Sequence, residues 1–297
     1  MLDHTVRIPK YYRRRLAKEM RPMLDTCRRA SGRPFVHQII ESVLSVSVVA
    51  RCRITPAAKM HAEDMGFLRR AMNASRQNSF SETMTGLVRA FSGHFRTVRA
   101  FHGCRPASFE PYLTHGLLPL SRELLSQHAY SLFAGKISRD EADVLVAKAD
   151  LSTRLGVIHF GTDPRAQISE YGHYLIDGPE SLCRVFDGAR FSERRERRRQ
   201  LGVPTMIDCA VPLELISPER QANLARHVIT AFFSEQSDIP DEDSWDNDCS
   251  VILESPLSPK NILGHFHPAE IYDAHGDGAP YRSPVTKCRW CAEWPSG

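Results

Sequence analysis

The sequence predicts an α+β protein in which a helical N-terminal region, residues 1–96, precedes a domain with a split, mixed β-sheet, residues 97–268. Helical patterns of apolar residues occupy the first hundred positions. After residue 96, short apolar runs of strand length alternate with helices and long loops. The last segment, residues 269–297, is rich in Gly, Pro and Asp. We therefore expect a tail that needs an additional constraint to become ordered.

Four helices are expected in the N-terminal region. Pro22 is expected to bend or break the first, which is highly charged. Pro34 opens a second, more apolar helix. Thr55 supplies an N-cap for the third, and Pro56 occupies its first helical position. The predicted helices cover residues 10–29, 34–50, 55–72 and 82–94.

Four short apolar runs after residue 96 have the length and composition of β-strands. Helices are expected between them where capping signals stand, as at Asp163-Pro164 and at the capping-box pair Ser138 and Glu141. Gly116 is expected to close a short helix after the first strand. The chain contains no GxGxxG or GxxxxGK[ST] motif, so the common dinucleotide and phosphate-loop folds have no support. The predicted strands cover residues 97–103, 156–162, 204–211 and 249–255, and a further helix covers residues 217–233.

The composition is that of an ordinary globular protein, with 42% hydrophobic and 25% charged residues. The longest apolar run, residues 43–50, is interrupted by two serines and is too short to cross a bilayer, so no membrane association is expected. The first residues lack the apolar segment of a secretory signal. Eight cysteines without such a signal fit a reducing compartment, and we expect a cytoplasmic protein.

The net charge of +4 is unevenly distributed. Up to Arg99 there are 19 Lys and Arg against 7 acidic residues, and in the remainder 20 against 28. A basic N-terminal region favours contact with nucleic acid, with an acidic partner or with the acidic part of the same chain, although an Arg-rich solvated surface is equally compatible. Two basic runs are candidates for a nucleic-acid backbone, YYRRR at residues 11–15 and RRERRR at residues 194–199. The second contains a glutamate and is better explained as a solvated helix face.

The segment FHGCRPASFEPYLTHGLLP, residues 101–119, resembles the first block of the ADP-ribosyltransferase superfamily. In that family a strand ends in His-Gly, the histidine orients the nicotinamide ribose of NAD, and the glycine backbone contacts the nicotinamide amide. The resemblance assigns these parts to His102 and Gly103. The chemistry is consistent, because an imidazole can hydrogen-bond a ribose hydroxyl and a glycine lets the backbone approach a planar ligand.

The segment GVIHFGTDPRAQISEYGHYL, residues 156–175, resembles the second block of the family, a strand and helix beneath the nicotinamide. His159 and Phe160 fall where the family has a Tyr-Phe pair, so His159 stands in place of the usual tyrosine. Tyr171 resembles the aromatic residue further along the helix. Tyr174 is another candidate for stacking, since a flat π face suits a nicotinamide or an adenine.

The segment CSVILESPLSPKNILGH, residues 249–265, resembles the last core strand of the family and its Pro-rich turn, but it departs from the pattern at the acidic residue. The family places a glutamate there to bind a ribose hydroxyl and stabilise an oxocarbenium-like transition state. The best register puts Ser250 at this position. Asp248 and Glu254 would lie on the same face of the strand, and Glu180, in the first turn of its helix, is a further candidate. The sequence leaves the catalytic acid open, with Asp248 and Glu180 the leading choices.

The resemblance implies an NAD-dependent mono-ADP-ribosyltransferase whose acceptor is a protein or a nucleic acid. Many bacterial members are toxins or phage-defence effectors, so the resemblance implies a similar role here. The missing glutamate also fits an enzyme similar to the NAD-dependent RNA 2′-phosphotransferases, which have a related fold. A third possibility is a non-catalytic binding protein with a degenerate pocket.

Two close pairs of nitrogen and sulfur donors near the C-terminus suggest a metal site. GHFHP supplies His265 and His267, and KCRWC supplies Cys288 and Cys291. Alternate residues of an extended segment point the same way, so both imidazoles could reach one ion. This donor set suits tetrahedral, structural zinc that would order the tail. The alternatives are surface histidines beside a reduced thiol pair and, in an oxidising compartment, a disulfide.

Overall fold

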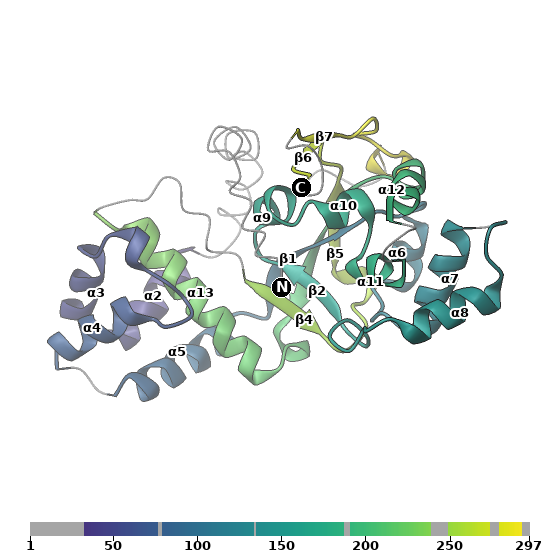
Figure 1. Ribbon diagram of the computed structural model, residues 1–297. Coiled ribbons are helices and arrows are strands. Elements are labelled where there is room, and N and C mark those ends of the chain that lie inside the picture. The colour runs from purple at the N-terminus through teal and green to yellow at the C-terminus, as the bar shows by residue number, and fades with distance from the viewer. Residues whose placement is uncertain are drawn as a thin grey trace. The chain divides into compact units, whose positions relative to one another are not determined.

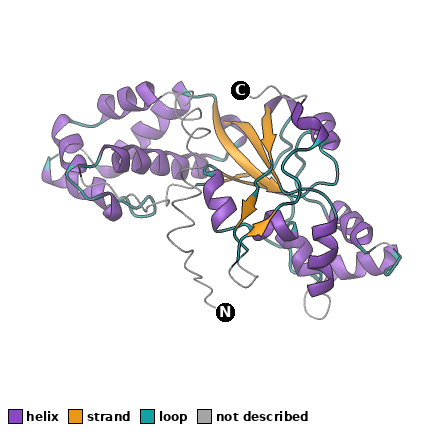
Figure 2. Cartoon of the chain, turned by 90° about the horizontal axis from the view of Figure 1, so that it is seen from above, coloured by secondary structure: helices purple, strands orange, loops and turns teal. Residues whose placement is uncertain are grey.

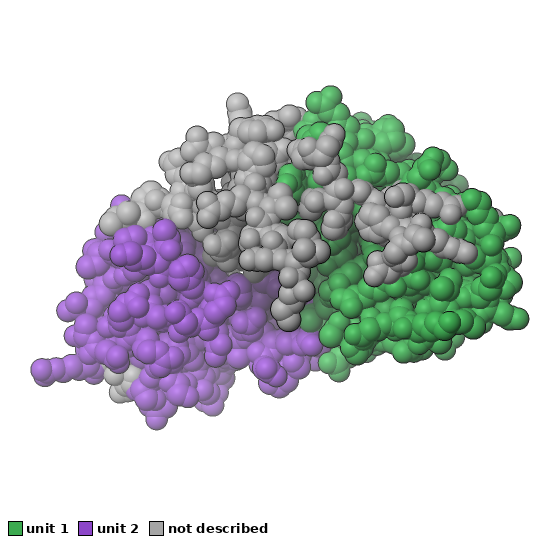
Figure 3. All heavy atoms as spheres, in the orientation of Figure 1, with its two compact units in different colours: residues 1–6, 99–211, 252–297 green, residues 7–98, 212–251 purple. Residues whose placement is uncertain are grey.

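The structure, a computed structural model, comprises two compact units (Figures 1 and 3). Helices account for 52% and strands for 16% of it, which confirms the predicted α+β class. None of the described helices combines the length and apolar character needed to span a bilayer. Unit 1 comprises residues 1–6, 99–211 and 252–297, and unit 2 comprises residues 7–98 and 212–251. The described residues are 33–76, 79–133, 135–186, 191–238, 249–273 and 279–292, with the main chain alone for 33–35, 191–195 and 292.

Unit 2 is a helical assembly with one apolar core, to which α13 (Pro218–Gln236) contributes together with helices from the N-terminal segment (Figure 1). Ile40, Leu87, Ile229 and Phe233 are all 0% exposed. Phe233 meets Phe67 edge to face, with ring centroids 5.9 Å apart, a geometry that aromatic pairs favour. Shared burial therefore holds α13 against helices that precede it by more than a hundred residues. The other elements are α2 (Arg33–Val43), α3 (Val46–Arg53), η1 (Ala57–Lys59), α4 (Gly66–Ala74), α5 (Phe80–His94) and η3 (Leu213–Leu215).

The single helix predicted at residues 34–50 is two helices. α2 ends at Val43, and α3 begins at Val46. Between them Ser45 is extended, with φ −66° and ψ 153°, and serves as the N-cap position of α3. The prediction is wrong here because a serine is favoured at a helix boundary, where its side chain competes with the backbone for hydrogen bonds.

The helix predicted at residues 55–72 is wrong in its first half. Pro56 precedes only the short 3₁₀ turn η1, and α4 begins at Gly66. The helix predicted at residues 82–94 is confirmed as α5, whose N-cap Ser79 accepts a hydrogen bond from the backbone amide three residues later. The helix predicted at residues 10–29 lies outside the described residues.

Unit 1 is built on a five-stranded sheet, and helices lie beside it (Figure 2). β1 and β2 are antiparallel, with Phe101 opposite Gly161, and β3 and β5 are antiparallel, with Met206 opposite Phe266. All four predicted strands are confirmed, and β5 is a further strand outside the predicted ranges. In spatial order the strands are β4 (Ser250–Leu253), β2 (Ile158–Gly161), β1 (Thr97–Cys104), β3 (Thr205–Pro212) and β5 (Ile262–Phe266), and a separate ribbon pairs β6 (Glu270–Ile271) with β7 (Tyr281–Arg282).

Three helices of unit 1 pack around a small apolar cluster. They are α7 (Arg122–Leu132), α8 (Arg139–Lys148) and α11 (Glu180–Val185). Leu125 and Ala142 are each 0% exposed in this cluster. The capping box predicted for α8 is confirmed, because Ser138 and Glu141 exchange backbone-to-side-chain hydrogen bonds of 2.7 and 3.1 Å. The remaining elements are α6 (Glu110–His115), α9 (Pro164–Ser169), α10 (His173–Asp177), α12 (Phe191–Gln200), η4 (Pro259–Asn261) and η5 (Arg289–Ala292).

Gly116 closes α6 as predicted, and its conformation also joins α6 to the chain after β4. Its φ is +73°, which favours glycine. The next residue, Leu117, exchanges two backbone hydrogen bonds with Leu257, of 3.0 and 2.9 Å. A Cβ on Gly116 would lie 1.9 Å from the carbonyl oxygen of Leu257, so no other residue fits this crossing.

The boundary expected near residue 96 lies close to a boundary between the units, after residue 98, whereas the one expected near residue 268 does not separate them. Residues 212–251 belong with the N-terminal helices because α13 completes their core. Residues 252–297 belong to the unit that contains the sheet, so the segment expected to be a tail is part of unit 1.

Candidate functional site

The pairing of β1 with β2 positions His102. Its Nδ1 lies 2.9 Å from the backbone oxygen of His159, and its ring meets Phe160 edge to face with centroids 5.7 Å apart. Burial lowers the pKa of His102 despite the opposing effect of that hydrogen bond, so the imidazole is neutral near pH 7. Because Nδ1 carries the proton that it donates to the carbonyl, Nε2 is the hydrogen-bond acceptor of the ring.

A polar network continues from the side chain of His159. Its Nε2 lies 3.4 Å from Nη1 of Arg154, which is in turn paired with Glu180 at the start of α11. The Tyr174 hydroxyl lies 3.3 Å from Oε2 of Glu180, and Arg184, one helical turn later, donates to Oε1 at 2.8 Å. We call these five residues the Glu180 network. The structure thus connects His102 to Glu180 through β2 and one arginine.

The two arginines determine the electrostatics of the Glu180 network. Burial opposes ionisation of Glu180, but hydrogen bonds and positive charge from Arg184 and Arg154 lower its pKa overall. Burial, together with the nearby carboxylate, raises the pKa of Tyr174 to about 12. At neutral pH the network therefore holds an ionised carboxylate, a neutral phenol and two guanidinium groups, with a net charge of one positive unit.

The remaining residues predicted to contact NAD differ in exposure. Phe160 is 3% exposed, so its ring belongs to the core. A Cβ on Gly103 would meet Oε1 of Gln167 at 2.9 Å, so this glycine lets α9 approach β1 closely. Tyr171 is 47% exposed and stacks with Tyr174, with centroids 6.5 Å apart and an interplanar angle of 22°. Of these positions, Tyr171 and Tyr174 can offer a ring to a ligand.

Among the candidate acids, the structure joins Glu180 to the residues of the first two blocks. Glu254 lies just after β4 and is exposed, as is Ser250 at the start of that strand. Asp248 lies outside the described residues. Of the candidate acids that the structure describes, Glu180 is therefore the one connected to His102.

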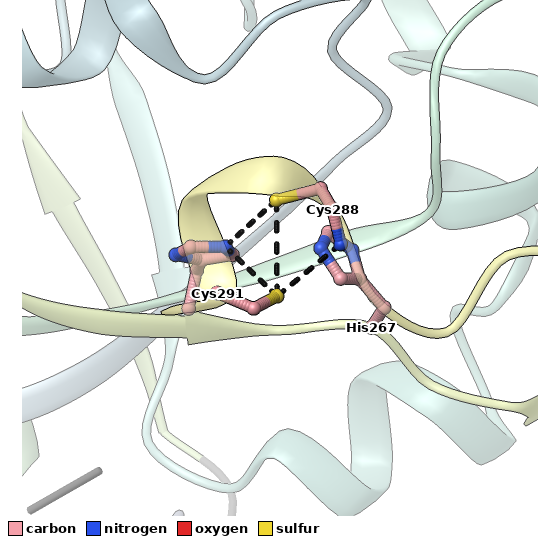
Figure 4. A group of neighbouring side chains, drawn as sticks. His267, Cys288 and Cys291 are labelled. Atoms are coloured by element: carbon pink, nitrogen blue, oxygen red, sulfur yellow. Dashed lines mark hydrogen bonds between the residues drawn. The ribbon is translucent and has the colours of Figure 1, made fainter. Parts of the chain in front are cut away.

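The structure brings the four predicted metal ligands together. The ligand atoms of His265, His267, Cys288 and Cys291 all lie within 4.8 Å of one another. Figure 4 shows His267 and both cysteines turned toward a common point. Burial lowers the pKa of His265 to about 4, and that of His267 is lowered for the same reason. Both imidazoles are neutral at pH 7, and the neutral ring is the form that binds metals.

The C-terminal part of the basic run at residues 194–199 is hydrogen-bonded within unit 1. Arg198 donates to the carbonyl oxygen of Arg105 at 2.6 Å, and Arg199 pairs with Asp273 at 2.7 Å. The guanidinium groups of Arg198 and Arg199 therefore bind protein atoms, whereas the sequence predicts a helix face exposed to solvent. The basic run at residues 11–15 lies outside the described residues.

Sequence reasoning missed the two arginines of the Glu180 network. Arg184 could have been found, because it stands four residues after Glu180 on a predicted helix, the spacing of a helical ion pair. Arg154 precedes β2 and lies 26 residues from Glu180. No local pattern reveals a contact of that kind, since it depends on how the helices pack.

Comparison with known proteins finds no matching family model, no matching curated protein and no matching solved structure. The interpretation of the site therefore rests on its own geometry and on the three resembling blocks.

Proposed function

We propose that unit 1 binds NAD and transfers its ADP-ribose to a macromolecular acceptor, either a protein or a nucleic acid. The observation that carries the proposal is the connection of His102 to Glu180 by way of His159 and Arg154. His102 and His159 belong to different resembling blocks and are 57 residues apart in the sequence. The strands of all three blocks, β1, β2 and β4, are also neighbours in the sheet.

The charge and exposure of the Glu180 network support the binding of NAD. Arg154 and Arg184 outnumber the single carboxylate between them, and guanidinium groups bind phosphate oxygens well. The pyrophosphate of NAD matches this excess of positive charge. The exposed ring of Tyr171, backed by Tyr174, supplies a flat face for a nicotinamide or an adenine.

The proposed reaction breaks the bond between C1′ of the ribose and the nicotinamide nitrogen, and nicotinamide leaves with the electron pair. Positive charge develops on the ribose, and the ionised Glu180 stabilises it. The neutral His102 accepts a hydrogen bond from a ribose hydroxyl at Nε2. A nucleophile of the acceptor then bonds to C1′ and loses its proton to solvent or to a nearby base.

The test is transfer of label from NAD. We expect the purified chain, given radiolabelled NAD and a total cell extract, to label a macromolecule and release nicotinamide. Digestion with protease or nuclease then identifies the class of acceptor. Glu180→Gln should slow transfer on the order of 100-fold, because an amide does not stabilise the cationic transition state as a carboxylate does.

Glu254→Gln is the matched control, since it removes an exposed carboxylate after β4 and should leave transfer unchanged. If His102→Ala labels as well as the original chain, the site assignment is wrong. If Asp248→Asn abolishes transfer while Glu180→Gln does not, the catalytic acid lies in the segment before β4.

A second candidate function is NAD-dependent removal of a 2′-phosphate from RNA. The contact of Arg154 with His159 favours it, since such enzymes use arginine and histidine together on the cleft. Loss of a 2′-phosphate from RNA that depends on added NAD would support this activity over protein modification. Binding of NAD without release of nicotinamide or loss of phosphate would instead indicate a non-catalytic binding protein.

A role as a toxin or phage-defence effector forms part of the proposal. Uncontrolled transfer of ADP-ribose to an essential macromolecule should arrest growth of the cell that expresses the chain. The arrest should be relieved by Glu180→Gln and should persist with Glu254→Gln, as read from growth curves after induction.

A further inference from the structure

We propose that His265, His267, Cys288 and Cys291 bind one Zn²⁺ ion in a closed, structural site that fastens residues 279–292 to β5. This inference is independent of the NAD site, because it involves different residues and predicts a different measurement. It would hold for an enzyme and for a binding protein alike.

Local structure presents the two pairs of donors. His265 lies in β5 and His267 two residues later, so their side chains emerge on the same side of an extended segment. Cys288 and Cys291 flank a turn of the 3₁₀ helix η5, in which residues three apart lie above one another. Each pair is therefore placed by backbone geometry alone, and the fold needs only to bring the two segments together.

The separations among three of the four donor atoms are close to those of a tetrahedral zinc site, and all four atoms lie within 4.8 Å of one another. Zn–S bonds of about 2.3 Å and Zn–N bonds of about 2.05 Å at tetrahedral angles place two sulfurs about 3.8 Å apart, and a sulfur and a nitrogen about 3.6 Å apart. The Sγ atoms of Cys288 and Cys291 are 3.7 Å apart. Nε2 of His265 lies 3.2 Å from the first sulfur and 3.5 Å from the second.

The environment of His267 gives independent support. Its Nδ1 lies 2.9 Å from the carbonyl oxygen of Pro204, to which it donates its proton. The lone pair of the neutral ring is then on Nε2, which is buried and has no hydrogen-bond partner in the described part of the chain. Metal-binding histidines are commonly held in this way, with the other ring nitrogen donating to a carbonyl. A bound cation would satisfy the nitrogen that is otherwise left without a partner.

A disulfide and a reduced thiol pair both account for the cluster less well than zinc does. A disulfide requires two sulfurs about 2.05 Å apart, far closer than the 3.7 Å between Cys288 and Cys291. A reduced thiol pair explains the contacts of His265 but leaves Nε2 of His267 unsatisfied. Two thiolates and two imidazoles in a tetrahedral arrangement are the typical donors of zinc. Four protein ligands leave no open position for a substrate, which makes the site structural.

The contacts around the donors show what the ion would stabilise. The ring of His265 stacks on Phe109, with centroids 4.1 Å apart and an interplanar angle of 28°. Phe109 is the buried residue that immediately precedes α6. His267 also lies 3.2 Å from the hydroxyl of Thr205 at the start of β3. The ion would therefore connect the C-terminal segment to β5, β3 and the start of α6.

The test is the metal content of the full-length, reduced chain purified without chelator. Elemental analysis by mass spectrometry should find one zinc per chain. The double substitution Cys288→Ser, Cys291→Ser should lower the zinc content at least tenfold. Cys183→Ser, which removes a thiol of the same unit outside the cluster, should retain one zinc per chain.

Cobalt substitution of the unaltered chain makes the test independent of whether the variants fold. Once a chelator has removed the bound zinc and has itself been removed, added Co²⁺ should give thiolate-to-cobalt charge-transfer absorption and the intense visible bands of tetrahedral coordination, and zinc added back should abolish both. The proposal is overturned if the reduced chain holds no stoichiometric zinc and gives no such bands. It is equally overturned if rapid thiol trapping in cell lysates recovers Cys288 and Cys291 as a disulfide.

Discussion

The two polar clusters of unit 1 differ in how their charges are balanced. In the Glu180 network each charged group faces one of opposite sign, since the carboxylate is held by Arg154 and by Arg184. In the cluster of His265, His267 and the two cysteines, the atoms that converge all carry lone pairs. Lone pairs that point at one another are stable only with protons or a cation between them. The first cluster is therefore complete in itself, whereas the donors of the second are suited to share a cation.

This difference has consequences for ligand binding at each cluster. A cation can enter the His/Cys cluster by replacing the thiol protons of the two cysteines. A phosphate that binds the Glu180 network must compete with Glu180 for its arginines. NAD binding would then weaken the ion pairs between Glu180 and its arginines. The carboxylate of Glu180 could then turn toward the ribose. The charge balance of each cluster can therefore be tested separately, with a substitution or a ligand that acts on that cluster alone.

Removing the proposed zinc should have the largest effect, since the ion would hold together the four converging donors of the His/Cys cluster. We expect a strong zinc chelator to lower the free energy of unfolding of unit 1 by about 3 kcal/mol or more, because closed zinc sites contribute folding energy directly. For a unit of this size the melting temperature should fall by about 6–12 °C. Differential scanning calorimetry with and without chelator measures the shift. The double cysteine variant should already melt at the lower temperature and should not respond to the chelator.

Low pH should destabilise the fold by protonating His102. This histidine lies on β1 and is hydrogen-bonded to the backbone of His159, a member of the Glu180 network. Its pKa is lowered in the folded chain, so the unfolded chain, with a pKa of about 6.5, takes up the proton first. The free energy of unfolding should therefore fall as pH drops below about 6.5, and His102 should account for part of that loss.

Urea unfolding at pH 7 and pH 5 checks this dependence on His102. His102→Gln should lose less stability between the two pH values than the original chain does. His115→Gln, which alters an exposed histidine at the end of α6, is the control. Equal pH dependence in both variants would show that His102 is not buried in its neutral form.

Within the Glu180 network, the two arginines should contribute unequally. The side chain of Arg154 is 29% exposed, and its removal leaves a partly buried carboxylate with one partner fewer. We expect Arg154→Ala to cost about 1–2 kcal/mol. The side chain of Arg184 is 43% exposed, and Arg184→Ala should cost less than about 1 kcal/mol, as surface ion pairs do. Urea denaturation gives both values, and the reverse order would contradict the proposed balance of charges.

The smallest expected effect concerns the exposed ring beside the network. Tyr171→Ala should weaken NAD binding about fivefold, equivalent to about 1 kcal/mol of lost stacking. Isothermal titration calorimetry measures the affinity. Tyr130→Ala, on α7, should bind NAD as the original chain does, and an unchanged affinity in Tyr171→Ala would place the ligand elsewhere.

The sequence predicted those features that depend on short-range patterns. The strands followed from apolar runs of the right length, and the two donor pairs of the His/Cys cluster stood out because their members are two and three residues apart. The break between α2 and α3 depended on Ser45 and was missed. The contact of Arg154 with Glu180 depends on packing between distant segments, and no pattern in the sequence encodes it. The grouping of α13 with the N-terminal helices has the same origin.

The position of α13 also constrains the order in which the nascent chain can fold. The core of unit 2 includes Ile229 and Phe233, so the helices that leave the ribosome first cannot complete it alone. More than a hundred residues separate the end of α5 from the start of α13. At typical rates of translation this interval is on the order of ten seconds. During that time the apolar faces of α2 to α5 stay partly uncovered, which makes them a target for chaperones that shield emerging chains.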